Sequence, residues 1–130
     1  MGSAKTVLLV DDDADFVEMN RVLLQENGYT VRAAFSGRQC REEVIAHPPD
    51  LIILDMVMEN ASVGFDLSRE LRNSERTKGI PLVMITSVND SSPFRLEPDH
   101  TWLPVDALLE KPVDPHLLLA VVDRALKSAP

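Results

Sequence analysis

Short apolar runs alternate along the chain with amphipathic stretches of helical length. A parallel β-sheet needs this alternation, because its strands are buried on both faces and are joined by crossover helices. The pattern therefore predicts an α/β fold, a five-stranded parallel sheet with helices on both faces. The expected strands are Thr6–Val10, Thr30–Phe35, Leu51–Leu54, Leu82–Ile85 and Ala107–Leu109.

Capping residues mark the ends of the expected helices. The first helix covers Ala14–Asn27, with Phe16, Met19 and Leu23 at i, i+3 and i+7 on its apolar face, and Gly28 follows as its stop. The second begins at a capping box, in which Ser36 caps the amides and Gln39 reaches back to the Ser36 amide. Two further helices are expected, one near Phe65–Ser74 and a last one with Asp114 as N-cap and Pro115 at its first position.

The stretch before Ala107 carries Pro93, Pro98 and Pro104, each of which removes an amide donor and disfavours helix just before it. A fourth helix between the fourth and fifth strands is therefore expected to be short, displaced or missing. Trp102 lies in this stretch. We expect it to pin an irregular segment to the core, with a partner contact as the alternative.

The length of 130 residues predicts one domain, residues 1–130 with a core of about 5–127. No apolar run approaches the roughly 20 residues that cross a bilayer. The start of the chain lacks a signal core, and Cys40 is the single cysteine, so we expect a cytoplasmic protein without disulfides. A net charge of -8 works against direct nucleic-acid binding. The chain ends soon after the last helix, so no effector domain is expected within it.

Polar side chains follow four of the expected strands. The carboxyl ends of parallel strands open on one edge of a sheet, where ligands bind, so these side chains should converge. Taken singly, each has an ordinary structural explanation, and for Asp13 we favour a helix cap. The converging residues are Asp11, Asp12 and Asp13 after the first strand, Asp55 after the third, Thr86 and Ser87 after the fourth, and Lys111 after the fifth.

The acidic cluster predicts a metal and a nucleophile. Clustered carboxylates repel one another unless a cation neutralises them, and hard oxygen ligands suit Mg²⁺. An aspartate can also form an aspartyl phosphate, in a transfer driven by positioning and charge stabilisation. Asp55 is the candidate nucleophile, while Lys111 and the Thr86 hydroxyl are placed to contact the phosphoryl oxygens.

The motifs VLLVDDD, PDLIILDMVM, IPLVMITS and LLEKP together resemble the response-regulator receiver family over essentially the whole chain. The resemblance implies a flavodoxin-like, doubly wound sheet of order 2-1-3-4-5. The implied roles are metal binding for Asp11, Asp12, Asp55 and the Val57 backbone carbonyl, phosphoryl acceptance for Asp55, the switch hydroxyl for Thr86 and the family's lysine for Lys111, with Lys111–Pro112 a candidate cis peptide.

By the same resemblance, the chain is expected to be a phosphoprotein of a two-component or phosphorelay system. A histidine kinase or histidine phosphotransfer protein would supply the phosphoryl group in an Mg²⁺-dependent transfer. The aspartyl phosphate would then switch a surface that binds a downstream protein. Catalysis would be limited to the chain's own phosphorylation and dephosphorylation, so it is not expected to be an enzyme.

Three positions depart from the family pattern. Glu59 stands where family members usually have proline, and Gly64 comes one residue late. Leu108, three residues before Lys111, replaces the usual Tyr or Phe. The relay from the threonine to an aromatic ring is therefore not available in its usual form.

The last helix carries an uninterrupted apolar run, Leu117 to Val122, with Leu119 and Leu126 as a second stripe beside the buried one. Two stripes suggest two packing partners, such as the core and a homodimer or another protein. The alternative is that these leucines are merely partly exposed.

Three other functions fit parts of the sequence. A haloacid-dehalogenase-type phosphohydrolase would use Asp11 as nucleophile and Asp13 as acid/base, but Asp55 would then lack a role and no later acidic pair completes its metal site. A calcium loop fits at Asp11, Asp13 and Asp15, yet Phe16 occupies the place that needs glycine. An unphosphorylated scaffold is disfavoured by retention of all five polar positions, although the missing aromatic favours it.

We predict slow self-dephosphorylation. Val57 and Val88, two residues after Asp55 and Thr86, are apolar where many receivers have polar groups that help water attack. Failure to orient water raises that barrier. Intact-mass measurement after removal of the phosphoryl donor follows the decay, and loss within seconds in Mg²⁺ contradicts the prediction.

Overall fold

The computed structural model describes residues 4–56, 63–86 and 105–128, and for residues 63–65 and 128 the backbone alone. The strands and helices alternate as the apolar pattern predicts. Their bounds are β1 Thr6–Val10, α1 Ala14–Glu26, β2 Thr30–Ala34, α2 Gly37–Ala46, β3 Leu51–Asp55, α3 Val63–Asn73, β4 Leu82–Thr86, β5 Ala107–Glu110 and α4 Pro115–Ser128.

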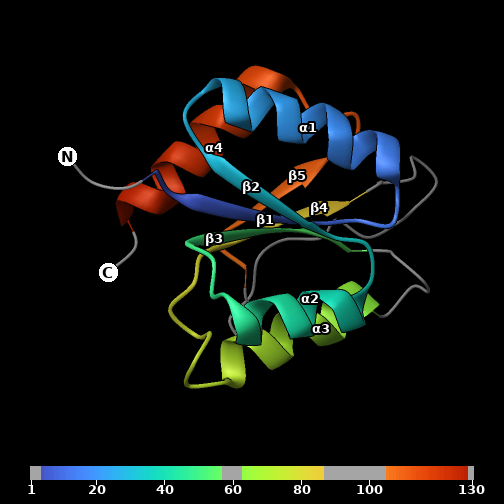
Figure 1. The fold of residues 1–130 in the computed structure, drawn as a ribbon, viewed down its shortest axis with the longest axis vertical. Coiled ribbons are helices and arrows are strands. Elements are labelled where there is room, and N and C mark those ends of the chain that lie inside the picture. Colours follow the sequence, from blue (N-terminus) through green and yellow to red (C-terminus); the bar gives the residue numbers. More distant parts are fainter. Residues whose placement is uncertain (1–3, 57–62, 87–104, 129–130) are drawn as a thin grey trace.

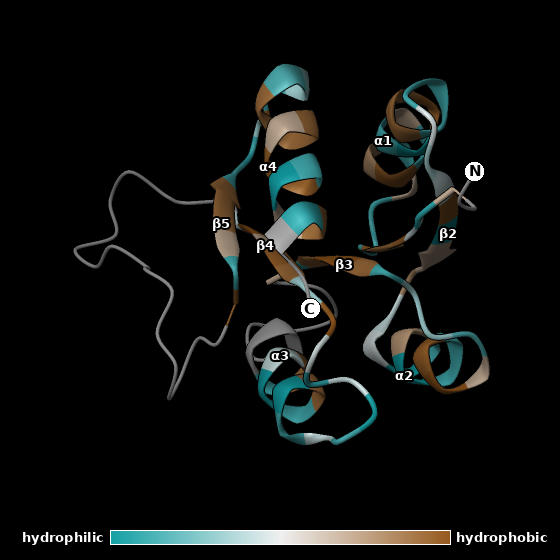
Figure 2. Cartoon of the chain, turned by 90° about the vertical axis from the view of Figure 1, so that its left-hand side faces the viewer, coloured by the Kyte–Doolittle hydropathy of each residue, from teal (hydrophilic) through white to brown (hydrophobic). Residues whose placement is uncertain are grey.

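The five strands form one parallel sheet of order β2-β1-β3-β4-β5. Helices α1 and α4 cover one face and α2 and α3 cover the other (Figure 1). This is the predicted flavodoxin-like arrangement. β3 and β4 are buried along their whole length because they lie in the middle of the sheet with helices on both sides (Figure 2).

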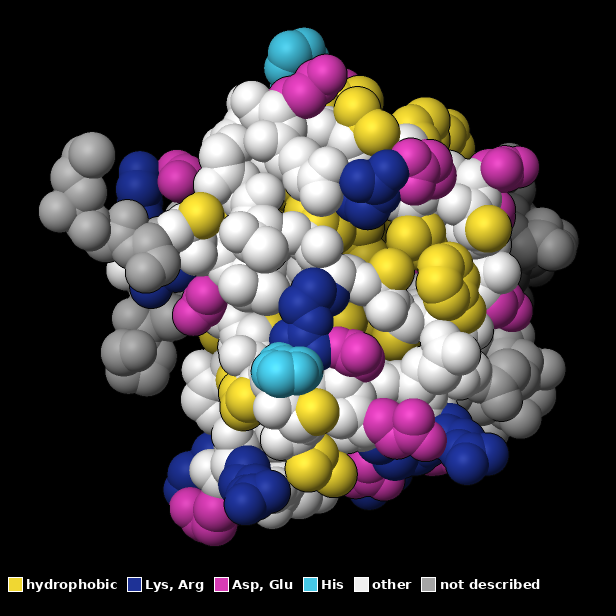
Figure 3. Space-filling model, viewed as in Figure 1, with side chains coloured by type: hydrophobic (Ala, Val, Ile, Leu, Met, Phe, Trp, Pro, Cys, Tyr) yellow, Lys and Arg dark blue, Asp and Glu magenta, His cyan; other side chains and the backbone are white. Residues whose placement is uncertain are grey.

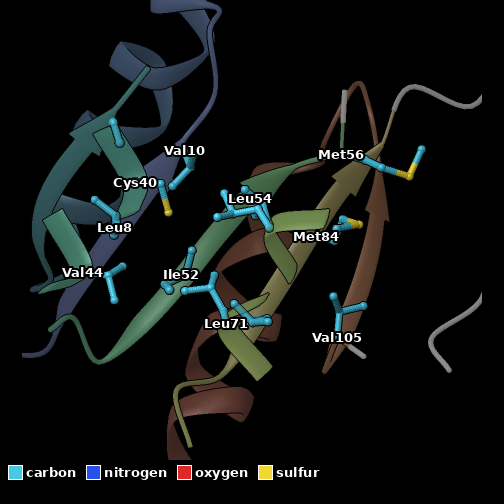
Figure 4. Close-up of a cluster of buried hydrophobic side chains, with 13 residues drawn as sticks. Leu8, Val10, Cys40, Val44, Ile52, Leu54, Met56, Leu71, Met84 and Val105 are labelled. Atoms are coloured by element: carbon cyan, nitrogen blue, oxygen red, sulfur yellow. The ribbon is translucent and has the colours of Figure 1, made fainter. Parts of the chain in front are cut away.

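Alternation of side chains along each strand divides the core into two clusters. The cluster under α2 and α3 includes Leu8, Ile52, Leu54 and Met84 (Figure 4). The cluster under α1 and α4 includes their neighbours in the strands, such as Leu9 and Ile53. The sheet is thus fixed from both faces, which sets the positions of its strand ends.

The predicted helix caps are present, with one shift. The Asp13 carboxylate accepts the amides of Asp15 and Phe16 at the start of α1, and Ser36 Oγ accepts the Gln39 amide at the start of α2. Gln39 Oε1, however, accepts the amide of Phe35, one residue before the predicted donor. The Thr30 amide and the Ala34 carbonyl face β1, so by alternation the Phe35 amide lies on the free edge of β2, where the Gln39 side chain satisfies it.

The last helix begins as predicted, with Asp114 Oδ1 accepting the amides of His116 and Leu117. The first and third helices differ from expectation by one or two residues at their ends, as helix termini commonly do. The predicted fourth helix, its three prolines and Trp102 lie outside the described residues. In the described ranges, no helix is both long and apolar enough to cross a membrane.

The second leucine stripe of α4 is mostly used inside the chain. Leu119 and Leu126 are partly buried and pack against the cluster under α1 and α4. Leu117 is 50% exposed. The alternative that these residues are partly exposed within one core therefore accounts for most of the stripe.

Two adjacent leucines of α4 test the assignment of its buried side. Leu118 is fully buried, so Leu118→Ala should lower the free energy of unfolding by about 2–5 kcal/mol. Leu117→Ala is the matched control, expected to change it by about 0.5 kcal/mol or less. Urea denaturation measures both values, and equal losses would contradict the assignment.

Candidate functional site

The sheet brings the predicted polar residues to one edge. Val10 of β1 lies opposite Leu54 of β3, so Asp11 and Asp55 are the next residues of two adjacent strands. Asp55 in turn lies opposite Ile85, one residue before Thr86. The site therefore follows from strand register, with residues that are far apart in sequence.

Three carboxylates meet there. One oxygen each from Asp11, Asp12 and Asp55 lies within 4.8 Å of the others. Asp11 and Asp55 are 2% and 5% exposed, whereas Asp12 is open to solvent. Two buried like charges are unfavourable without a cation, so the cluster requires positive charge.

Lys111 supplies one such charge. Its Nζ lies 2.9 Å from Asp11 Oδ2 and 3.8 Å from Asp55 Oδ2. Its backbone amide donates to the Thr86 carbonyl at 2.8 Å. Lys111 is thereby anchored beside Thr86 and reaches across the edge toward both acids.

Asp11 is held in place by its neighbours. Its Oδ1 accepts the Asp13 amide at 2.9 Å, and its own amide donates to the Ala34 carbonyl of β2. Asp13 turns its side chain to the α1 amides, as the cap prediction states. The hydrolase alternative needs Asp13 as acid/base, and the calcium-loop alternative needs the residues after Asp13 to form a loop. Both alternatives are disfavoured, because Asp13 caps a helix that starts at Ala14.

Thr86 ends β4 and is 1% exposed. Ser87, Val57 and Val88 lie outside the described residues, as does Glu59. Lys111–Pro112 is a cis peptide, as predicted. Leu108 is opposite Met84 and packs, partly buried, against the cluster under α2 and α3.

Phe16 belongs to this site, although the sequence pattern assigned it only to the apolar face of the first helix. Lys111 Nζ lies over its ring, 4.4 Å from the centroid. Lys111 is far from Phe16 in the sequence, so the periodicity of the first helix gave no signal for this contact. The cap prediction at Asp13 could have helped, since it fixes Phe16 in the first turn of α1.

The donor set fits Mg²⁺. All three clustered groups are hard carboxylate oxygens, and Mg²⁺ typically binds one or two carboxylates while keeping several waters. Among the described residues of the cluster, three negative groups face the single ammonium of Lys111. A divalent cation at Asp11, Asp12 and Asp55 would balance the remaining charge.

Cys40 offers no competing nucleophile. It is fully buried in α2, and burial raises the pKa of its thiol to about 12. The thiolate is the reactive form of cysteine, so Cys40 stays protonated and inert at neutral pH.

Curated proteins with similar sequences include response regulators and transcriptional regulatory proteins. PhoB of Pseudomonas aeruginosa, a phosphate regulon transcriptional regulatory protein, is 34% identical over 125 residues, which cover 95% of this chain and 52% of PhoB. The chain spans about half the length of the curated relatives it matches.

Two solved structures have nearly the same fold. The chemotaxis response regulator CheY4 of Vibrio cholerae is 27% identical, with a TM-score of 0.79 and coverage of 95% of this chain and 99% of that one. The signal receiver domain of a signal transduction histidine kinase from Syntrophus aciditrophicus is 26% identical, with a TM-score of 0.82 and coverage of 95% and 91%.

The family model for the response regulator receiver domain matches residues 7–123, which contain every strand end of the site. The motifs, the strand order and the acidic edge agree with this match. The chain therefore belongs to the response regulator receiver domain family of two-component systems.

Proposed function

We propose that the chain is a phosphoacceptor that takes a phosphoryl group on Asp55 in an Mg²⁺-dependent reaction. The observation that carries the proposal is the meeting of Asp55 with Asp11 and Asp12 within 4.8 Å and with the Lys111 ammonium at 3.8 Å. A nearly buried carboxylate flanked by metal-type ligands and a cation is placed for nucleophilic attack on phosphorus.

The transfer begins from a phosphohistidine. An oxygen of the Asp55 carboxylate attacks phosphorus, an O–P bond forms and the P–N bond breaks. The electron pair of the P–N bond stays on the imidazole nitrogen, which takes a proton from solvent if its ring is not already protonated. No proton has to leave Asp55, so the reaction needs charge stabilisation and positioning more than acid/base catalysis.

Lys111 and Thr86 are the groups proposed to contact the phosphoryl oxygens. The Lys111 ammonium carries a positive charge and three N–H donors, and it already lies beside both Asp11 and Asp55. Thr86 ends the neighbouring strand and offers a hydroxyl donor. When Asp55 carries a phosphoryl group, added negative charge strengthens both interactions.

Asp11, Asp12, Asp55 and the Val57 backbone carbonyl are the residues proposed to hold Mg²⁺. When bound, the ion supplies charge neutralisation for the phosphoryl oxygens. The fit of the three carboxylates supports this assignment, and Val57 stays a prediction from the family resemblance. Catalysis is confined to the chain's own phosphorylation and dephosphorylation, so we do not propose an enzyme with a separate substrate.

The proposed partners are a histidine kinase or histidine phosphotransfer protein and a downstream protein, in the cytoplasm. A homodimer through α4 has less support than the sequence suggested. Of the large apolar side chains described in the run Leu117 to Val122, Leu117 alone is well exposed, which leaves little apolar surface for a second copy.

Direct binding of nucleic acid by this chain is not part of the proposal. Basic side chains over α2 and α3 lie beside acidic ones on the face seen in Figure 3. Arg41 pairs with Glu70 and Lys78 with Glu75, so these charges are partly neutralised. The net charge of -8 also opposes phosphate backbones.

Asp55→Asn should abolish labelling by acetyl phosphate in Mg²⁺, because the amide is not a nucleophile for phosphorus. Intact-mass measurement detects the added phosphoryl group on the wild type and its absence on the variant. Asn has nearly the same volume as Asp, and a melting curve controls for folding. Continued labelling of Asp55→Asn would contradict the proposal and favour Asp11 as nucleophile.

Mg²⁺ should stabilise the protein through the acidic cluster. A ligand at a hundredfold excess over its Kd adds about 2.7 kcal/mol to the free energy of unfolding. Asp12→Ala should remove most of this gain, since it deletes a ligand and a like charge. Thermal denaturation with and without Mg²⁺ measures the gain.

The matched control is Asp15→Ala, which removes an exposed aspartate from the first turn of α1, outside the acidic cluster. This control should keep the Mg²⁺ gain of the wild type. An unchanged gain in Asp12→Ala would overturn the metal assignment.

A further inference from the structure

The Lys111 ammonium contacts two acids and an aromatic ring. Its Nζ lies 2.9 Å from Asp11 Oδ2 and 3.8 Å from Asp55 Oδ2. It also lies over the ring of Phe16, 4.4 Å from the centroid. An ammonium within about 6 Å of the face of an aromatic ring is attracted by the ring quadrupole. Phe16 therefore contacts the one cation of the described site, and it does not occupy the carboxylate oxygens that would bind a metal.

The Phe16 backbone is fixed by side chains on both its polar groups. Its amide donates to Asp13 Oδ1 at 3.2 Å, and its carbonyl accepts from Asn20 Nδ2 at 2.8 Å. Asn20 is buried, and the Phe16 ring packs, partly buried, against the cluster under α1 and α4. The ring is thus carried by a rigid element, as a group that positions another must be.

Lys111 needs such a restraint. Lysine is a point charge on a flexible four-carbon stem, and ordering it costs conformational entropy. The Lys111 side chain is still 22% exposed, so water competes for the ammonium. A ring face over Nζ reduces the access of water to the ammonium, and its attraction favours the position that Nζ takes beside Asp11 and Asp55.

We propose that Phe16 is a positioning residue for phosphoryl transfer, which acts by holding the Lys111 ammonium over the edge between Asp11 and Asp55. The inference rests on the proposed function, since Lys111 is there assigned to the phosphoryl oxygens. It adds a residue of α1 to a site otherwise built from strand ends. It also assigns a role to a side chain that the apolar pattern treats as core.

The contact itself is tested by NMR in the absence of any phosphoryl donor. The Lys111 ε-methylene signals, identified by their loss in Lys111→Met, should be shifted upfield by the ring current of Phe16. Phe16→Leu should remove this shift and Phe16→Tyr should retain it. Identical Lys111 signals in the wild type and Phe16→Leu would overturn the inference.

The role in transfer is tested with acetyl phosphate, a donor too small to require a docking surface. Phe16→Leu should slow labelling of Asp55 by about two- to fivefold, the factor that matches a cation–π contact at a partly exposed site. Phe16→Tyr should restore the wild-type rate because it keeps the ring. Leu23→Val, which trims a partly buried residue of the same helix and core cluster, is the control for lost packing and should leave the rate unchanged.

A double-mutant cycle distinguishes positioning from a general structural effect. In a Lys111→Met background, Phe16→Leu should have no further effect on the labelling rate. An equal slowing in both backgrounds, or no slowing in either, overturns the inference. If the wild type is not labelled on Asp55, the proposed function fails together with the role of Phe16 in transfer, and the NMR shift then reports only the contact.

Discussion

The parallel pairing of β1 with β3 is the constraint on which the site depends. It sets Val10 opposite Leu54 and so places Asp11 and Asp55 side by side at the carboxyl edge. Both carboxylates are nearly buried, so their repulsion is poorly screened by water. Lys111 offsets part of it. The sheet edge is therefore an arrangement that favours a divalent cation, and any change in register would separate the acids and remove that preference.

The rest of the fold keeps this edge rigid. Two apolar clusters fix the sheet from both faces, and Lys111 is tied through its amide to the Thr86 carbonyl. Asp11 is tied through Oδ1 to the Asp13 amide, and Asp13 in turn caps α1. Charged groups that are already oriented need little reorganisation when new negative charge arrives beside them. The Asp13 cap thus fixes the start of α1 and also helps to orient Asp11 at the site.

The sequence predicted the strands, the parallel sheet and the converging acids, because these depend on apolar runs and on the polar residues directly after them. The order of the strands came from the family resemblance. It missed features that depend on tertiary geometry. The Gln39 side chain accepts the amide of Phe35 and not that of Ser36, the donor that the capping-box pattern predicted. The Phe16 ring meets Lys111 because the Lys111 side chain reaches from the end of β5 to Asp11, just before α1, and neither periodicity nor spacing encodes that contact. Helix periodicity identifies the buried face, but not which buried residue contacts a charge.

Leu108 departs from the family pattern at a position in the sheet close to Thr86. It lies opposite Met84 in the sheet and packs, partly buried, against the cluster under α2 and α3, which includes Met56. Thr86 follows Met84 by two residues, so strand alternation puts its side chain on the same face. The neighbouring cross-strand pair on this face is Met84 with Leu108, and methionine adapts to small displacements by changing rotamer. Where the family pattern has an aromatic ring, this chain has an aliphatic side chain against a flexible thioether, so a movement of Thr86 would meet side chains that adjust gradually.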